Sequence, residues 1–285
     1  SQPDRPAGRG RRPQPPPVAL AAAELGLPLH QPSKIRTPEV AALLAAARPD
    51  VILVVAYGRI LPASILRAAP RGCVNVHFSL LPRHRGAAPV AHAVLAGDER
   101  TGVSLMVLDE GMDTGPVLVQ REVAIGAEET AGELTERLAK LGAEMVASEL
   151  PRHLSGELAQ RAQPAEGATT APMLSKSDGA LRWDRPAVEI DRRIRALNPW
   201  PGAFGFVRGQ RWIVHRARPL AGVPSPGPGV LRIHGRQLEV GAADVSLDLL
   251  ELQREGSRRM DVGSFLAGSA PPAGATIGPE RGGGE

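Results

Sequence analysis

Apolar positions follow different patterns in the two halves of this chain. In the first half, short apolar runs alternate with segments whose apolar residues recur every three or four positions. The clearest run, residues 51–57, is apolar throughout, which is typical of a central parallel strand buried on both faces. A short helix is expected at residues 61–66 and a further strand at residues 73–77. Alternating strands and helices predict an α/β domain with a mainly parallel sheet.

Helix-start signals support this pattern. Thr37 precedes Pro38 and Glu39, which is the arrangement of an N-cap followed by a first helical turn. Thr130 and Glu133 form a second start signal, a capping box. We expect the long helix that follows to be buried along one apolar stripe. The stripe consists of Leu134, Leu138, Leu141 and Met145.

The second half of the chain has a different pattern. Residues 155–172 lack periodicity and are interpreted as a linker, and residues 188–197 predict a helix that ends before a proline. The short alternating strands beyond it, joined by Gly-containing turns, predict a small β-barrel of the oligonucleotide-binding type. The expected organisation is an α/β catalytic domain at residues 1–154, a linker at 155–173 and a β-barrel domain at 174–285.

The first seventeen residues are interpreted as a loop, because they are dense in Pro, Gly and Arg and have no apolar period. The first strand and first helix of the α/β domain are therefore expected to be missing. Such a gap would expose an apolar sheet edge, so we expect the chain to be poorly stable. The loop is either a Pro-rich tail or a segment whose arginines meet phosphate groups. These arginines are Arg5, Arg9, Arg11 and Arg12.

Composition restricts the class of protein. The 285 residues are 42% hydrophobic, which supports a packed core, and the apolar runs are too short for a membrane span. We expect no signal peptide, because the start lacks a basic region followed by an apolar one. The single cysteine, Cys73, excludes an intramolecular disulfide and favours a reducing cytoplasm. Its place in a Val-rich strand favours a buried, inert thiol over a nucleophile.

The net charge of +4 is unevenly distributed. Residues 1–36 carry six Lys or Arg and two acidic residues, and residues 181–285 carry fifteen Arg and eleven acidic residues. Residues 37–180 carry thirteen basic and seventeen acidic residues. Basic ends around an acidic middle indicate a large polyanionic partner held from both sides. An Arg-rich composition spread over solvated surfaces explains the charge equally well.

The candidate site lies at the carboxyl end of the strand expected at residues 73–77. Successive side chains of a strand point to opposite faces, so Asn75 and His77 share one face. The carboxyl end of a strand in an open α/β sheet is a usual place for chemistry. A further strand is expected at residues 101–108, and Asp113 lies in the loop that leaves it. Each residue alone has an ordinary structural explanation, such as an Asx turn at Asp113, but together they indicate a site.

An amide, an imidazole and a carboxylate fit acyl transfer without a covalent enzyme intermediate. Asn75 and protonated His77 can donate hydrogen bonds to an oxygen that gains negative charge. His77, or a water beside Asp113, can take the proton of an attacking amine, and Asp113 would also orient the imidazole. Ser79 and Thr114 do not lie in a Gly-x-Ser-x-Gly elbow, which disfavours serine catalysis. The histidines lack partners at metal-ligand spacing, so we expect no metal.

These residues lie in motifs that resemble the folate-dependent formyltransferases. The shared motifs are residues 75–82 with 85–89, and residues 111–116. Outside that core, the chain resembles the family members whose acceptor is initiator methionyl-tRNA, at residues 3–10, 174–183 and 195–203. The resemblance covers nearly the whole chain, and its long motifs are highly specific. It implies a Rossmann-like N-terminal domain and a β-barrel C-terminal domain.

The resemblance also implies a reaction and roles for individual residues. A formyl group would move from 10-formyltetrahydrofolate, the co-substrate, to the methionine amine of charged initiator tRNA. Asn75, His77 and Asp113 match the catalytic trio of the family. The stretch that lines the tetrahydrofolate pocket is matched by Ser79, Leu80, Leu81 and Pro82.

The resemblance assigns the first arginines to tRNA. Arg9 falls where the family has a functional arginine in its tRNA loop, and Arg5, Arg11 and Arg12 are assigned with it. Phe78 is a departure, because the family often has a small residue there, and its ring is expected to reshape the folate pocket. Two rival functions stay open: a folate formyltransferase for a small amine, such as glycinamide ribonucleotide or an amino sugar nucleotide, and a non-catalytic RNA-binding protein. We expect a cytoplasmic monomer.

Overall fold

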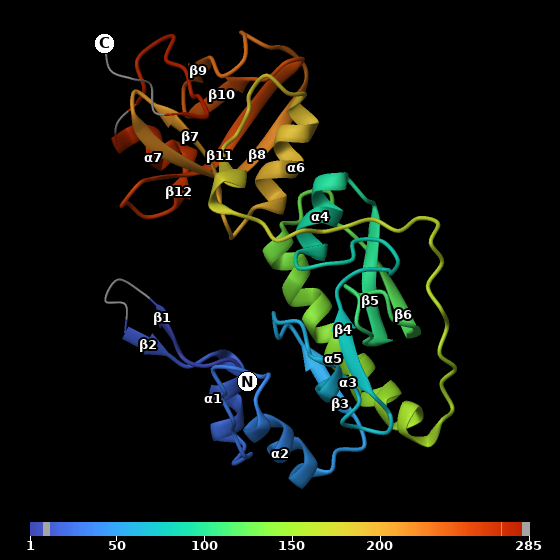
Figure 1. The fold of residues 1–285 in the computed structure, drawn as a ribbon. Coiled ribbons are helices and arrows are strands. Elements are labelled where there is room, and N and C mark those ends of the chain that lie inside the picture. The colour runs from blue at the N-terminus through green and yellow to red at the C-terminus, as the bar shows by residue number, and fades with distance from the viewer. Residues whose placement is uncertain (8–11, 269, 281–285) are drawn as a thin grey trace. The chain divides into compact units, whose positions relative to one another are not determined.

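The computed structural model describes residues 1–7, 12–268 and 270–280 (Figure 1). Packing divides the chain into two compact units. The first unit contains Ser1–His77, Ser104–Gln120 and Ala143–Glu166, and the second contains Phe78–Val103, Arg121–Gly142 and Gly167–Glu285. The units interleave along the sequence, and the domain boundaries expected at residues 154 and 174 stay a prediction.

The first unit begins with a β-hairpin. Strand β1 (Arg5–Ala7) pairs antiparallel with β2 (Arg12–Gln14), and helix α1 (Pro17–Glu24) follows. The interpretation of residues 1–17 as a loop is therefore wrong at these strands. The fixed φ of proline suits an extended chain, and pairing between backbones needs no apolar period, so the side-chain pattern contained no signal for the hairpin.

Two helices and a strand enclose the apolar cluster of the first unit. Helix α2 (Pro38–Ala47) begins where its N-cap predicts, because Thr37 Oγ1 accepts a hydrogen bond from Val40 N at 3.4 Å. Helix α3 (Ala63–Leu66) is the short helix expected after the apolar run. The buried members of the cluster are Ile35, Ile65 and Cys73, packed against Val40, Leu44, Ile52 and Val54 among others.

Strand β3 (Ile52–Val55) is an end strand of a sheet with the order β3-β4-β5-β6. Ile52 and Val54 pack on the apolar cluster, whereas Leu53 and Val55 are 40% and 48% exposed. The expectation of a central strand buried on both faces is therefore wrong for the described residues. Because side chains alternate along a strand, a run that is apolar throughout leaves apolar side chains on whichever face is uncovered.

The sheet is mixed, so the expectation of a mainly parallel sheet needs correction. Strand β3 is parallel to β4 (Cys73–His77), but β4 is antiparallel to β5 (Arg100–Val107). Strand β6 (Val117–Ala124) follows β5 in the sheet order. The connection through α4 (Pro89–Ala96) returns the chain in the opposite direction, which a pattern of apolar residues does not encode.

Helix α5 (Ala131–Ser155) starts with the predicted capping box. Thr130 N donates to Glu133 Oε2 at 2.9 Å, and Glu133 N donates to Thr130 Oγ1 at 3.3 Å, so two free amides of the first turn are satisfied. The predicted stripe is confirmed at three fully buried positions and one half-buried position. These are Leu134, Leu138 and Met145, with Leu141 half-buried.

The C-terminal part of the second unit is an antiparallel sheet with the order β7-β8-β11-β10-β9, and β12 pairs with β11 (Figure 1). Its strands are β7 (Ala203–Val207), β8 (Gln210–Pro224), β9 (Leu231–His234), β10 (Gln237–Gly241), β11 (Val245–Arg254) and β12 (Met260–Asp261). Its helices are η1 (Lys176–Gly179), α6 (Ala187–Ala196) and α7 (Val262–Gly268). The predicted change from an α/β to an antiparallel β pattern is confirmed.

The two end strands of this sheet both contact one segment near the C-terminus. Gly278 exchanges backbone hydrogen bonds of 3.0 and 2.7 Å with Phe206 of β7, and Ile277 N donates to the carbonyl of Gly229, before β9, at 2.8 Å. Within the described residues, the strand ladders form an open path that this segment connects at both ends. The core includes Trp212 and Phe265, whose rings meet edge to face at 4.6 Å.

No helix in the described parts of the chain combines the length and the apolar character needed to cross a membrane.

Candidate active site

Asn75 and His77 lie on strand β4 as the alternation predicts. Val74 and Val76 are buried on one face, while Asn75 and His77 belong to the other. His77 is also almost fully buried, at 5% exposure. An imidazole in such a place needs polar partners, because burying it without them would cost free energy.

The structure brings Asp113 to these two side chains. Asn75 Nδ2 is 3.5 Å from Asp113 Oδ1, which is a long hydrogen bond, and His77 Nδ1 is 3.6 Å from Asp113 Oδ2, which is an ion-pair distance. The side chains of His77 and Asp113 are only 5% and 14% exposed. The predicted convergence of the trio is therefore observed. Long contacts of this kind are common in active sites without substrate.

The loop that carries Asp113 is tightly organised. Asp109 Oδ1 accepts hydrogen bonds from Gly111 N at 3.0 Å and from Thr114 Oγ1 at 2.7 Å. Asp113 itself has a positive φ of 53°, a left-handed conformation that Asp adopts more readily than most residues. A Cβ at Gly115 would collide with the carbonyl oxygen of Val107, so only glycine fits there.

The hydroxyls and the thiol near these residues are poor nucleophiles. The Ser79 hydroxyl donates to Arg83 O at 2.6 Å, and the Thr114 hydroxyl donates to Asp109. Cys73 is fully buried, and this burial raises its pKa to about 11, so the reactive thiolate is scarce at neutral pH. The arrangement favours direct transfer, in which the trio donates hydrogen bonds and accepts a proton.

No group of three or more His, Cys, Asp or Glu side chains in the described residues could hold a metal ion.

The four residues assigned to folate divide into two pairs. Ser79 and Leu81 are buried, at 0% and 6% exposure, while Leu80 and Pro82 are partly exposed. Leu80 packs close to Gly102, where a Cβ would lie 2.6 Å from Leu80 Cδ2. The side chains of the partly exposed pair are accessible to solvent, whereas those of the buried pair lie inside the loop.

A backbone segment in the expected linker holds the loop after these residues. We call residues 169–171 the brace. Arg85 N donates to Thr169 O at 2.9 Å, Ala171 N donates to Arg85 O at 2.7 Å, and Ala88 N donates to Ala171 O at 3.1 Å. The Thr169 hydroxyl also accepts from His84 N at 2.8 Å. Because these bonds involve mainly backbone atoms, the side-chain pattern contained no signal for them.

An ion-pair cluster supports the same loop. His84 Nε2 lies 2.7 Å from Asp98 Oδ2, and Arg83 Nη2 lies 2.6 Å from Asp98 Oδ1. Partial burial acts to raise the pKa of Asp98, but the hydrogen bonds from Arg83 and His84 outweigh it and hold this pKa below its ordinary value. Asp98 follows the end of α4, outside the motif that it supports, so the sequence contained no signal for this role.

The arginines assigned to tRNA are described only in part. Arg5 is exposed on β1, and its Nη2 donates to Gln2 Oε1 at 3.2 Å. Arg9 and Arg11 lie outside the described residues, as does the side chain of Arg12.

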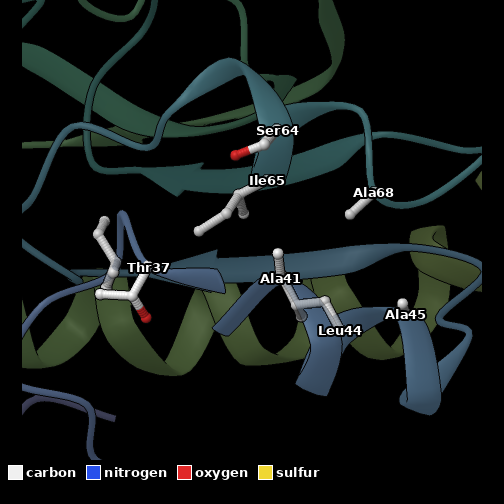
Figure 2. Close-up of a pocket in the computed structure, with 8 residues that line it drawn as sticks. Thr37, Ala41, Leu44, Ala45, Ser64, Ile65 and Ala68 are labelled. Atoms are coloured by element: carbon white, nitrogen blue, oxygen red, sulfur yellow. The ribbon is translucent and has the colours of Figure 1, made fainter. Parts of the chain in front are cut away.

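A pocket of about 240 Å³ lies elsewhere in the first unit (Figure 2). Figure 2 shows Thr37, Ala41, Leu44 and Ala45, at and along α2, facing Ser64, Ile65 and Ala68. Its described lining is aliphatic with two hydroxyls, and it includes none of the trio. Since acyl transfer needs a group that accepts a proton, this pocket is not the candidate site.

Comparisons with known proteins match both the N-terminal and the C-terminal part of the chain to formyl transferases. The model of the formyl transferase family matches residues 1–150, and that of the formyl transferase C-terminal domain matches residues 173–270. A methionyl-tRNA formyltransferase of Myxococcus xanthus is 50% identical over 94% of this chain and 86% of its own length. The corresponding protein of Sorangium cellulosum is 45% identical over 97% of this chain and 90% of its own length.

Solved structures share the fold at low identity. HypX from Aquifex aeolicus, crystallised with tetrahydrofolic acid, matches with a TM-score of 0.62 and 18% identity over 81% of this chain and 41% of that protein. The sugar 3N-formyl transferase WlaRD matches with a TM-score of 0.62 and 14% identity over 85% and 82%. The chain therefore belongs to the formyl transferase family, in the branch that contains the methionyl-tRNA formyltransferases.

Proposed function

We propose that this chain transfers a formyl group from 10-formyltetrahydrofolate to the methionine amine of initiator methionyl-tRNA. The observation that carries the proposal is the convergence of Asn75, His77 and Asp113 around a buried imidazole. The near-full-length similarity to methionyl-tRNA formyltransferases supports the choice of acceptor. The trio supports the reaction, acyl transfer without a covalent intermediate, and the similarity supports the class of acceptor.

Each member of the trio has a separate task. The bound folate supplies a formyl group on a nitrogen atom that can leave. Asn75 and protonated His77 donate hydrogen bonds to the formyl oxygen as negative charge develops there, and burial strengthens this interaction. Asp113, held 3.6 Å from His77 Nδ1, fixes the orientation of the imidazole. The amine forms the new bond to the formyl carbon and gives its proton to a water beside Asp113. The bond from the formyl carbon to the folate nitrogen then breaks, His77 protonates that nitrogen so that tetrahydrofolate leaves, and the proton held by the water returns to His77.

The exposure of residues 79–82 supports a position for the folate. Leu80 and Pro82 offer the apolar surface for the pterin ring, while Ser79 and Leu81 keep the loop in shape from inside. The two roles are separable, because the Ser79 hydroxyl is bonded to Arg83 O and not directed to solvent. Phe78 precedes this stretch and is also partly exposed, which supports the expectation that its ring reshapes the folate pocket.

The acceptor is a polyanion, and positive charge on the C-terminal sheet fits it. Exposed arginines stand at turns and on strands of this sheet, where they would release counterions from phosphates. They include Arg208, Arg232, Arg236 and Arg258. Arg5 on β1 offers a further contact, and Arg9, Arg11 and Arg12 keep their assignment to tRNA as part of the proposal. An aminoacyl-tRNA acceptor also supports a cytoplasmic location, and we propose that the chain acts there as a monomer.

Transfer of labelled formyl to a set of acceptors tests the function. Initiator methionyl-tRNA, elongator methionyl-tRNA, glycinamide ribonucleotide and an amino sugar nucleotide are each offered with 10-formyltetrahydrofolate. We expect label on the initiator tRNA in strong preference to the others. Preferential labelling of a small amine would replace the acceptor in the proposal. Binding of tRNA without labelling of any acceptor would favour the non-catalytic RNA-binding alternative.

A further inference from the structure

The expected linker also contacts the loop that carries Asp113. Arg161 pairs with Val117, the first residue of β6, through two backbone hydrogen bonds. Val117 N donates to Arg161 O at 2.8 Å, and Arg161 N donates to Val117 O at 2.9 Å. This antiparallel bridge fixes the backbone of the linker directly beside the end of the Asp113 loop. The backbone bridge at Arg161 therefore restricts the position of Gln163, two residues further along the chain.

The side-chain amide of Gln163 spans the loop. Gln163 Nε2 donates to the carbonyl oxygen of Asp113 at 2.8 Å and to that of Gly115 at 2.7 Å. Both distances are short for neutral N–H···O bonds, and one amide nitrogen has two hydrogens to supply them. A single side chain thus ties two carbonyls on either side of Thr114 to one point.

The loop has a reason to need this restraint. Asp113 has a φ of 53°, in the left-handed region that is unfavourable for a residue with a Cβ. A return to the common negative φ would rotate the Asp113 carbonyl away from Gln163, and it would also swing the carboxylate away from Asn75 and His77. The same backbone conformation that satisfies Gln163 therefore aims the carboxylate.

We infer that Gln163 is a positioning residue for formyl transfer: it holds Asp113 in the left-handed conformation that directs its carboxylate to Asn75 and His77. The inference rests on the proposed catalytic role of Asp113. Gln163 has no contact with substrate in this role and acts through the backbone of Asp113. Its loss should therefore lower kcat while leaving substrate binding, and so KM, nearly unchanged.

Two substitutions remove the donors while keeping the length of the side chain. Gln163→Met is uncharged, and Gln163→Glu replaces the donors by acceptors. Gln160→Met and Gln160→Glu are the matched controls, because Gln160 lies in the same segment with an exposed side chain. We expect both Gln163 variants to lose about 10- to 100-fold in kcat, with KM for the folate within about twofold of the parent value. The control variants should match the parent protein.

A structural readout uses the protein without substrates. Amide hydrogen exchange of residues 109–115 should be faster in Gln163→Met than in Gln160→Met, because the loop loses its restraint. Unchanged exchange in this loop would overturn the inference, as would a kcat within about twofold of the parent value for both Gln163 variants. A thermal midpoint lowered without any change in loop exchange or kcat would show a purely structural role.

A double-mutant cycle decides whether Gln163 acts through Asp113. Asp113→Asn is suited to the cycle, because Asn also tolerates the left-handed conformation. In the Asp113→Asn background, Gln163→Met should lower kcat by less than about twofold, since the group that it positions is already lost. An equal fractional loss in both backgrounds would refute the inference. If Asp113→Asn alone leaves kcat unchanged, the catalytic role of Asp113 fails instead.

Discussion

Gly86 offers the most direct test of the brace, because a methyl group there collides with it. Gly86 has a φ of 128°, and a Cβ at this position would lie 2.6 Å from Ala171 O. The Cβ is fixed rigidly to the backbone of residue 86 and Ala171 O is itself a backbone atom, so Gly86→Ala must displace the loop or the brace. Residues with a Cβ are strained at such φ values, at a cost of about 1–3 kcal/mol.

The collision also breaks hydrogen bonds, and their loss adds to the free-energy cost of the strain. Displacement of residue 171 breaks the bond from Ala88 N to Ala171 O and the bond from Ala171 N to Arg85 O. At about 1 kcal/mol for each, the total destabilisation is about 3–5 kcal/mol. Gly167→Ala is the matched control, since Gly167 has a φ of 73° but open space around its Cβ position. It should cost only about 1–2 kcal/mol.

Urea unfolding followed by tryptophan fluorescence measures the difference. The three tryptophans, Trp183, Trp200 and Trp212, all lie in the second unit, which also contains Gly86 and Gly167. The account predicts that Gly86→Ala is less stable than Gly167→Ala by about 2 kcal/mol. Equal free energies of unfolding for the two variants would refute the claim that the brace constrains this loop.

Two further predictions concern the same loop. The depressed pKa of Asp98 means that its ion pairs add stability above the ordinary pKa of 3.8, and that this contribution is lost as pH falls from there through the lower folded value. Asp98→Asn should therefore flatten the fall of the thermal midpoint below about pH 5, and an unchanged fall would contradict the assignment. Ser79→Ala should lower stability by about 1 kcal/mol and leave the KM for folate near the parent value, whereas Leu80→Ala should raise that KM several-fold. Kinetics and urea unfolding of both variants check this separation, and the reverse result would exchange the two roles.

The sequence predicted the trio because its signal is local. Asn75 and His77 share a strand face through simple alternation, and Asp113 follows the exit of a later strand. The capping box of α5 and its buried stripe are local in the same sense, because both depend on spacings within one helix. Such features follow from the regular spacing at which side chains of one strand or one helix share a face.

Features that depend on distant backbone were not predictable. The mixed direction of the sheet, the exposed face of β3 and the hairpin of β1 and β2 depend on which segments pair, and apolar period does not encode pairing. The contacts of Gln163 and Thr169 arise between carbonyls and amides far apart in sequence. Residues 155–172 lack periodicity and were therefore interpreted as a linker. They nevertheless make hydrogen bonds to the loop that carries Asp113 and to the loop at residues 84–88.

The central claim is that Asn75, His77 and Asp113 carry out formyl transfer. Single-turnover transfer to initiator methionyl-tRNA, measured for the parent protein and for His77→Ala together with the tRNA dissociation constant, tests it most directly. We expect a loss of transfer of about 100-fold or more, with tRNA affinity unchanged, because His77 is buried beside Asp113. Transfer within a few-fold of the parent rate would contradict the claim.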